Sequence, residues 1–341
     1  MRAKGISYDT GFVRGGTISR ERFDPDVVRR ELRIIRDDLN CTAVRVIGGD
    51  PERLERAAAY AADLGLEVWF SPYALELTSK EMLELFADCA ERAERLRQRG
   101  AEVVFVVGAE LSLMNKGFLP GDTQEDRLQL LLDQRDGLHE RVGEISARVN
   151  DFLAEATSLA REHFGGKITY ASIPLERIDW TPFDFVSVDL YRSAEVADQF
   201  SEGVRTLVAQ GKPVAITEFG TAAYRGAGDL GGRCMEIAEY DKGTGAPIRL
   251  NGEFTRDEAG QATYLRELVE IFDTNGVDSA FAFLFALDNF PHRPDGDPRD
   301  DLDLASPGIV KVLDNHHGDT YPDMPWEPKT AFTALADSYR A

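Results

Sequence analysis

The sequence predicts an α/β fold of the (β/α)8 barrel class, formed by residues 1–341 as a single domain. Eight short apolar segments alternate with amphipathic helical patterns in one continuous run. No linker rich in proline, glycine or serine divides the chain. An open, doubly wound sheet is the alternative, but the regular repeats and the absence of a GxGxxG turn favour the barrel.

The predicted strands are runs of apolar and β-branched residues, as expected of parallel strands that are buried on both faces. In chain order they cover residues 4–7, 42–47, 66–70, 102–107, 168–172, 185–190, 214–217 and 280–285.

Capping residues mark where several helices begin. Asp24 and Asp50 each precede a proline that suits the first helical turn. Residues 78–81 (TSKE) form a capping box, in which a threonine and a glutamate bind each other's backbone N–H groups. Residues 255–258 (TRDE) predict a second capping box before the helix that follows strand seven.

Two long segments without a regular pattern follow strands seven and eight, at residues 221–254 and 286–327. Loops of this length inside a compact domain are more often functional than decorative. In a barrel, the loops that follow the strands surround the active site. We therefore expect the segment after strand seven to be functional, and residues 295–303 of the second segment to form a solvated acidic loop.

Composition excludes several classes of partner. The net charge of −21 argues against binding to nucleic acid or to an anionic membrane surface. The N-terminus contains no long apolar segment, so neither a signal peptide nor a transmembrane helix is predicted. The cysteines, Cys41, Cys89 and Cys234, are odd in number and widely separated, which predicts no disulfide framework and a cytoplasmic location.

No metal site or cofactor is predicted. The chain has five histidines, none of which forms an HxH motif on an early strand. His316 and His317 are adjacent, a spacing that does not place two ligands on one face. Oligomeric state is not predicted.

Two glutamates follow apolar strands. Glu218 ends the strand in KPVAITEFG (residues 212–220), and Glu110 lies in GAEL (residues 108–111) after strand four. Because the C-terminal ends of barrel strands face one mouth, both carboxyl groups are expected to point into one cleft. Paired carboxyl groups hydrolyse glycosides, one as a protonated acid and the other ionised. Glu110 and Glu218 are therefore the candidate catalytic residues.

The other strand ends supply polar and aromatic side chains, including Asp189 on strand six. Aromatic rings at a mouth suit a carbohydrate ligand, because sugar rings present apolar C–H faces. The candidate substrate-binding residues are Asp9, Arg45, Trp69, Tyr73, Tyr191 and Asp288.

These motifs carry a family resemblance. KGISYD at the start, VRV on strand two, GAEL, ITEFG and the tyrosine that ends strand six resemble retaining (β/α)8 glycosidases, and in particular their β-mannanase-like branch. The closing segment from Trp326 to Tyr339 is also similar to the last helix of such barrels.

The resemblance implies roles for individual residues. Glu110 would be the acid/base, Glu218 the nucleophile, Tyr191 a hydrogen-bond donor to the nucleophile, and Arg45 a cation beneath it. The sequence differs from the pattern at Ala109, where many members have asparagine. It also differs at residues 283–286 (FLFA), where strand eight usually ends with a tryptophan.

The leading hypothesis is a retaining glycoside hydrolase that acts on a β-linked oligosaccharide without a cofactor. A second hypothesis is a barrel that binds a carbohydrate or a protein partner without catalysis, as in a phage-defence role. A third is another barrel enzyme that uses two carboxyl groups for proton transfer. The separation of the Glu110 and Glu218 carboxyl groups distinguishes these hypotheses, since beyond roughly 10 Å neither hydrolytic scheme operates.

Overall fold

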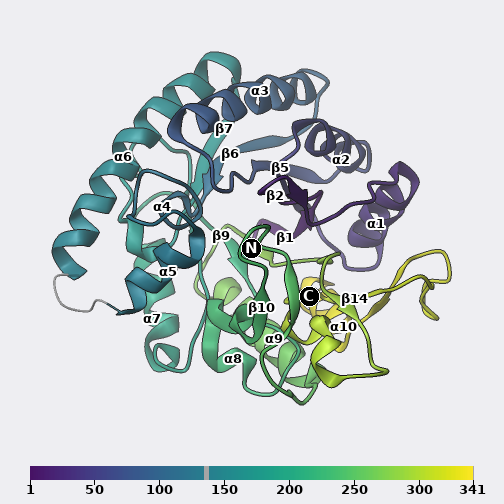
Figure 1. The fold of residues 1–341 in the computed structure, drawn as a ribbon. Coiled ribbons are helices and arrows are strands. Elements are labelled where there is room, and N and C mark those ends of the chain that lie inside the picture. Colours follow the sequence, from purple (N-terminus) through teal and green to yellow (C-terminus); the bar gives the residue numbers. More distant parts are fainter. Residues whose placement is uncertain (134–137, 341) are drawn as a thin grey trace.

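A computed structural model describes residues 1–133 and 138–340 and contains the predicted barrel (Figure 1). Eight parallel strands form one sheet in the order β7-β6-β5-β4-β1-β12-β9-β8. Its two edges meet through a parallel bridge between Ser172 and Val188, and the Asp189 N–H donates to the Ser172 carbonyl at 2.8 Å. The strands are β1 (Ala3–Asp9), β4 (Ala43–Gly48), β5 (Glu67–Pro72), β6 (Val103–Ala109), β7 (Lys167–Ala171), β8 (Val186–Asp189), β9 (Val214–Phe219) and β12 (Ser279–Ala282).

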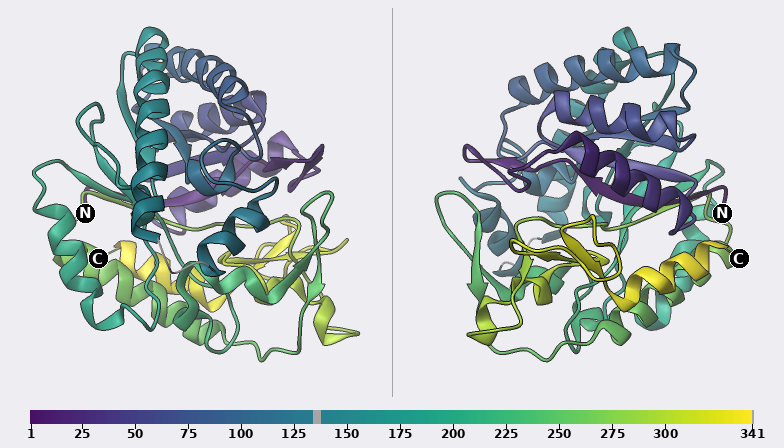
Figure 2. Two further views of the ribbon diagram at one scale, coloured as in Figure 1. Left: turned by 60° about the vertical axis from the view of Figure 1, so that its left-hand side comes forward. Right: turned by 90° about the vertical axis from the view of Figure 1, so that its right-hand side faces the viewer.

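An outer layer of helices surrounds these strands (Figures 1 and 2). It consists of α1 (Pro25–Asp37), α2 (Pro51–Asp63), α3 (Ser79–Gln98), α6 (Leu138–His163), α7 (Ala197–Val208), α9 (Glu258–Thr274) and α10 (Thr330–Arg340). The chain termini lie close together at the end of the barrel opposite the long loops (Figure 2), where Lys4 Nζ donates to the Tyr339 carbonyl at 3.0 Å. No helix of the described residues is long and apolar enough to cross a membrane.

The predicted helix starts are confirmed for α1, α2 and α3, and the Thr78–Glu81 capping box is present. The second predicted capping box is wrong. The N-cap of α9 is Asp257, which directly precedes the first helical residue and accepts from Gly260 N–H at 2.9 Å. Glu258 instead accepts from Thr330 N–H at 3.0 Å and so connects α9 to the start of α10.

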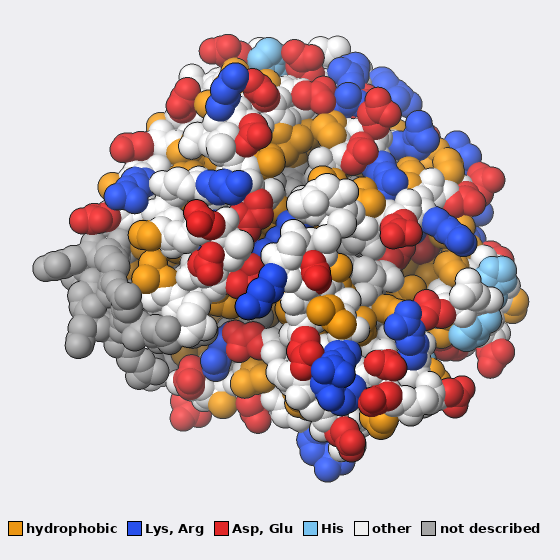
Figure 3. Space-filling view, viewed as in Figure 1, with side chains coloured by type: hydrophobic (Ala, Val, Ile, Leu, Met, Phe, Trp, Pro, Cys, Tyr) orange, Lys and Arg blue, Asp and Glu red, His pale blue; other side chains and the backbone are white. Residues whose placement is uncertain are grey.

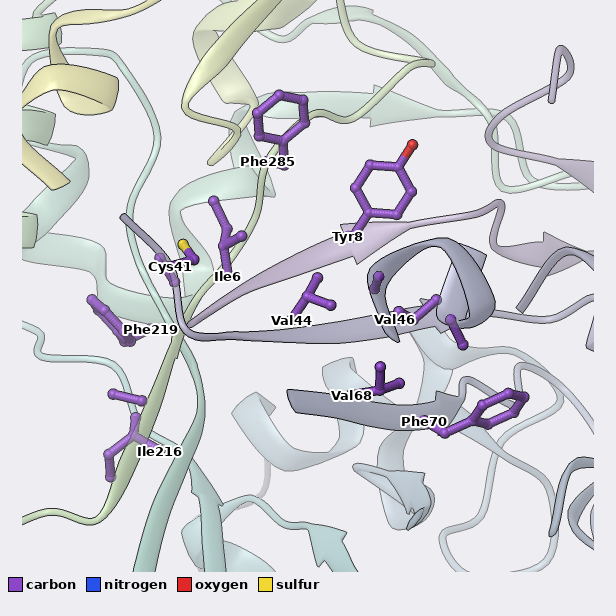
Figure 4. Close-up of a cluster of buried hydrophobic side chains, with 14 of the residues drawn as sticks. Ile6, Tyr8, Cys41, Val44, Val46, Val68, Phe70, Ile216, Phe219 and Phe285 are labelled. Atoms are coloured by element: carbon purple, nitrogen blue, oxygen red, sulfur yellow. The ribbon is translucent and has the colours of Figure 1, made fainter. Parts of the chain in front are cut away.

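Apolar side chains fill both sides of the barrel wall. Alternate residues of β1, β4, β5 and β9, among them Ile6, Val44 and Val68, point outward into the layer beneath the helices (Figure 4). Inside the barrel, Phe281 packs against Trp69 with ring centroids 4.8 Å apart. Gly5 makes room for Phe281, since a Cβ at this position would lie 2.4 Å from the phenyl ring.

The loops that follow the strands carry further secondary structure. After β1 comes the hairpin β2 (Val13–Arg14) and β3 (Thr17–Ile18), and after β6 come α4 (Leu111–Met114) and α5 (Gln124–Asp133). The loop after β7 contains the 3-10 turn η1 (Pro174–Glu176). The predicted long loop 221–254 contains α8 (Ala227–Leu230), η2 (Gly231–Ile237) and the hairpin β10 (Ala238–Tyr240) and β11 (Pro247–Leu250).

The second predicted long loop, 286–327, is anchored to the helices. It contains β13 (Pro291–His292), η3 (Pro298–Asp300), η4 (Leu302–Ala305) and β14 (Val310–Leu313), and β14 pairs with β15 (Trp326–Pro328). Asp303 contacts Arg256 at 2.8 Å and Lys329 at 2.9 Å, and all three side chains are largely buried. These ion pairs hold the loop against the starts of α9 and α10.

Candidate active site

A cavity of about 1710 Å³ lies at the C-terminal ends of the barrel strands. Figure 3 views the molecule from this side, and acidic and basic side chains are interspersed over the face. Residues of β8 and β9, of the segment that follows β6, of the β2–β3 hairpin and of both long loops line the cavity. Four of the lining residues are buried carboxylic acids, and three of these, Glu110, Asp189 and Glu218, lie together.

Glu218 extends from β9 and is held by two donors. Its Oε1 accepts from Arg45 Nη1 at 2.8 Å, and its Oε2 accepts from the Tyr191 hydroxyl at 3.0 Å. Arg45 is itself fixed by the Thr217 carbonyl at 3.0 Å and by Ser71 Oγ at 3.2 Å. Burial raises the pKa of Glu218, and the charge of Arg45 and the two hydrogen bonds oppose that rise.

Glu110 lies where β6 turns into α4. Its backbone is left-handed (φ 45°, ψ 41°), and its carbonyl accepts from the N–H groups of Leu113 and Met114. Left-handed backbone at a non-glycine residue costs of order 1–3 kcal/mol and is concentrated at functional sites. Burial raises the pKa of Glu110 well above its usual range, and the nearby carboxyl groups of Asp189 and Glu218 raise it further.

Asp189 is the third acid of this group, and the sequence-based selection omitted it. It ends β8 opposite Glu218 in the strand register, and its Oδ1 lies 3.9 Å from Arg45 Nη1. Neither carboxyl oxygen has a hydrogen-bond partner among the described residues. One oxygen each from Glu110, Asp189 and Glu218 lies within 4.8 Å of the others, and we call these residues the carboxyl cluster. The signal for Asp189 was its strand-end position, two residues before Tyr191.

The carboxyl cluster is the one group of acidic, histidine or cysteine side chains in the described residues with spacing suited to a metal ion. It contains no histidine or cysteine, and the Arg45 guanidinium already contacts Glu218 within it. Arg45 thus supplies the positive charge that a cation would bring, and we assign no metal ligands here.

Three of the predicted substrate-binding residues line the cavity: Tyr73, Tyr191 and Asp288. Tyr73 packs edge-on against Phe12, with ring centroids 5.0 Å apart. Asp288 lies 3.4 Å from Arg20 Nε, and burial raises the pKa of its carboxyl group while Arg20 opposes the rise. These three side chains therefore line the same cavity as the carboxyl cluster.

Trp69 does not lie where it was predicted. Its side chain is fully buried inside the barrel between Phe185 and Phe281, and it does not line the cavity. Its Nε1 donates to Glu67 Oε1 at 2.8 Å, toward the N-terminal ends of the strands. The prediction that Trp69 contacts substrate at the mouth is therefore corrected, since the ring closes the barrel interior.

Asp9 and Arg45 are also separated from the cavity. Asp9 is buried, and its oxygens accept from Gly11 N–H at 2.7 Å and from Ser19 Oγ at 3.0 Å. Burial raises the pKa of Asp9 to about 7. Arg45 is fully buried beneath Glu218. Both were predicted to bind substrate. The structure instead places Asp9 in a turn, and it places Arg45 beneath Glu218, as the family resemblance implied.

Further aromatic residues that the sequence-based selection omitted line the cavity, among them Phe12 and Phe283. Phe12 lies between β1 and the β2–β3 hairpin, where no periodic pattern marked it. Phe283 directly follows β12, in the FLFA segment that lacks the usual tryptophan. The end of strand eight thus presents an aromatic ring to the cavity.

No protein-family model and no curated protein sequence matches the chain. Solved structures do match it over nearly its full length. A GH113 β-1,4-mannanase is 15% identical with a TM-score of 0.61, covering 99% of both chains. The GH113 β-mannanase from Alicyclobacillus acidocaldarius is 14% identical with a TM-score of 0.57, covering 99% of this chain and 97% of its own. The endo-β-1,4-mannanase from Thermotoga petrophila is 10% identical with a TM-score of 0.53, covering 100% of this chain and 76% of its own.

At these identities the similarity concerns the fold. The resemblance expected from the strand-end motifs is therefore confirmed in the architecture, and this chain has the (β/α)8 barrel fold of the β-mannanases.

Proposed function

We propose that this chain is a glycoside hydrolase that cleaves a β-linked oligosaccharide with retention of configuration. The observation that carries the proposal is the approach of Glu110 and Glu218, whose nearest carboxyl oxygens lie within 4.8 Å. Retaining enzymes place their two carboxyl groups roughly 5–5.5 Å apart, whereas inverting enzymes leave roughly 6.5–9.5 Å for a water molecule. The separation supports direct attack by one carboxylate.

The surroundings of the two glutamates support different roles. Arg45 and Tyr191 stabilise the ionised form of Glu218, as a nucleophile requires. Glu110 has a pKa raised well above its usual range, so it holds a proton for the leaving oxygen. Attack of Glu218 on the anomeric carbon breaks the glycosidic bond while Glu110 protonates the departing oxygen. Glu110, now ionised, then deprotonates the water that hydrolyses the glycosyl ester.

The cavity supports a substrate larger than one sugar. Its volume of about 1710 Å³ exceeds the roughly 300–1,000 Å³ of ordinary small-molecule pockets. Phe12, Tyr73, Tyr191 and Phe283 offer aromatic surface to sugar rings. Because the structurally similar proteins are named β-1,4-mannanases, β-1,4-linked mannooligosaccharides are the first substrates to test.

The test is a comparison of the wild-type protein with Glu218→Gln on β-linked oligosaccharides and aryl β-glycosides. Wild type is expected to turn over at least one substrate, and the variant to lose about 10³-fold or more in kcat. Circular dichroism and thermal unfolding confirm that the variant is folded. Equal turnover by both proteins contradicts the proposal. An inactive wild type that binds oligosaccharides in calorimetry instead supports the non-catalytic binding barrel.

A further inference from the structure

Asp189 has no part in the two-carboxylate scheme, yet its environment sets it apart from an ordinary buried acid. Its side chain is fully buried, and neither oxygen accepts a hydrogen bond from the described residues. A buried carboxyl group without a hydrogen-bond donor is costly, and it persists only where something compensates. Asp189 lies on β8 beside Glu218, and one of its carboxyl oxygens is within 4.8 Å of a Glu110 carboxyl oxygen. A negative charge on Asp189 therefore acts on both proposed catalytic groups.

The charges of the carboxyl cluster do not balance when all of its members are ionised. Three acids share one fully buried guanidinium, that of Arg45. Like charges at this spacing in a poorly solvated site cannot all ionise at neutral pH, so the cluster retains a proton. Such acids titrate as a coupled group in which the ionisation of one raises the pKa of the next.

The position of Arg45 decides the order in which the protons leave. Its Nη1 lies 2.8 Å from Glu218 and 3.9 Å from Asp189. No ion pair within 4.0 Å joins Arg45 to Glu110 in the part of the chain that the structure describes. Glu218 therefore ionises first and Asp189 second, and Glu110 faces two carboxylates when its own proton is the last to leave.

We infer that Asp189 is a positioning residue for the acid of this site: it ionises before Glu110, and its negative charge then keeps the proton on Glu110. The inference deepens the proposed function and rests on it, since Glu110 is a catalytic acid only there. The underlying claim about ionisation is a property of the folded protein and can be measured without turnover.

The surrounding groups support this order. Burial raises the pKa of Asp189 and the charge of Glu218 adds to it, while Arg45 and the nearby Thr217 hydroxyl oppose the rise. For Glu110, the charge of Asp189 is the largest electrostatic contribution to the raised pKa, ahead of Glu218 and Glu176. Glu176 is already engaged by the Tyr170 hydroxyl at 2.7 Å and by Ser112 N–H at 2.9 Å.

Each neighbouring element contributes a charged or titratable group that faces this pair. These groups are Arg45 of β4, Tyr73 after β5, Tyr170 of β7, Glu176 of η1, Tyr191 after β8 and Glu218 of β9. The tyrosine hydroxyl groups have pKa values raised well above their usual range, because burial and the nearby acids disfavour their ionisation. They remain neutral, so among the described residues Arg45 is the one cation that faces these acids.

The experiment measures the ionisation of Glu110 directly. The protein is labelled with ¹³C at the glutamate side-chain carboxyl group and studied by NMR. The Glu110 resonance is assigned by its loss in Glu110→Gln. The pH titration of this resonance is then compared between wild type and Asp189→Asn. The asparagine has the same shape without the charge. The midpoint of Glu110 is expected to fall by about one pH unit or more in the variant, as expected for loss of a charge at this distance. An unchanged midpoint overturns the inference.

Two controls separate this effect from a general loss of charge or of structure. Asp198→Asn removes one charge from an exposed residue of α7 and is expected to leave the Glu110 midpoint unchanged. If Asp189→Asn does not fold, Asp189→Ser removes the same charge with a smaller side chain, and the midpoint is read there. An equal shift in Asp198→Asn also overturns the inference.

Activity provides a second readout where the proposed function holds. The alkaline limb of the kcat/KM profile is expected to move to lower pH in Asp189→Asn by the same amount as the Glu110 midpoint. A shifted midpoint in a protein without hydrolytic activity supports the ionisation claim and contradicts the proposed function. An active enzyme with an unshifted midpoint supports the proposed function and contradicts the ionisation claim.

Discussion

Arg45 of β4 and Glu218 of β9 are 173 residues apart in the sequence and form a buried ion pair, with Nη1 and Oε1 separated by 2.8 Å. The pair lies across the interior of the barrel, and the Tyr191 hydroxyl donates a hydrogen bond to the other oxygen of the Glu218 carboxylate. Removing charges from water is costly, so the geometry must be held by further contacts. Thr217 and Ser71 provide them by binding Arg45, and Glu218 is thereby fixed in the wall of the cavity.

Breaking this pair from the arginine side is expected to destabilise the protein. Arg45→Met leaves Glu218 buried without a counter-charge, at a cost of about 3–5 kcal/mol in the free energy of unfolding. Adding Glu218→Gln removes the uncompensated charge, so the double variant is expected to be more stable than Arg45→Met alone. Urea unfolding of both single variants and of the double variant measures the coupling. Additive effects of the two substitutions contradict the buried pair.

Replacing Glu110 tests its role as the acid. Glu110→Gln cannot protonate a leaving oxygen, so hydrolysis of an unactivated oligosaccharide is expected to fall by about 10²–10⁴-fold. An aryl glycoside with a strongly acidic phenol needs little protonation, so its cleavage is expected to fall much less. The ratio of the two kcat/KM losses is the measurement. Equal losses on both substrates contradict the assignment.

The Tyr191 hydroxyl is expected to control the acid limb of the pH profile. Its hydrogen bond stabilises ionised Glu218 and lowers the pKa of that carboxyl group, so Tyr191→Phe raises the pKa. The acid limb of kcat/KM then moves to higher pH by roughly one unit, the value of one hydrogen bond to a charged group.

Tyr240→Phe is the matched control for this shift. Tyr240 also lines the cavity, but its hydroxyl donates to the Met235 carbonyl at 3.2 Å. Its removal is expected to leave the acid limb in place. A limb that moves equally in both variants, or in neither, contradicts the role given to Tyr191.

Asp9 is expected to make stability depend on pH. Its pKa is raised by burial from 3.8 to about 7 in the folded protein, so folding favours its protonated form. The stability that this proton provides is fully present below about pH 4 and is lost as pH rises through about 7.

Asp9→Asn removes that dependence and keeps an acceptor for Gly11 N–H. The variant is expected to be the more stable protein at pH values above the folded pKa, by at most about 4 kcal/mol. Thermal unfolding of both proteins across the titration range measures the difference. A variant that loses stability with pH as steeply as wild type contradicts the raised pKa.

Much of this architecture follows from the sequence because it depends on local patterns. The eight apolar strands, the helix starts at Pro25, Pro51 and Ser79, and the two long loops are set by hydrophobic periodicity and capping residues. Glu110 and Glu218 could also be predicted from the sequence, since each follows a strand and barrel topology brings strand ends together.

The directions in which side chains point were harder to predict from the sequence. In a strand buried on both faces, apolar residues occupy every position, so the pattern does not reveal that Trp69 points into the barrel toward Glu67. The hydrogen bonds that hold Asp9 in its turn come from Gly11 and from Ser19, which lies beyond the β2–β3 hairpin. Asp189 became distinct from other strand-end acids only through its distance to Arg45, a residue far away in the sequence.

The central claim is that Glu218 forms a covalent bond to the sugar. The most direct measurement is peptide mass spectrometry after incubation with a 2-deoxy-2-fluoro β-glycoside, carrying a dinitrophenolate leaving group, of a sugar that wild type cleaves. The account predicts one fluorosugar per chain on the peptide that contains Glu218, and no label in Glu218→Gln. Label on a different residue, or hydrolysis with inverted products and no label, would contradict it.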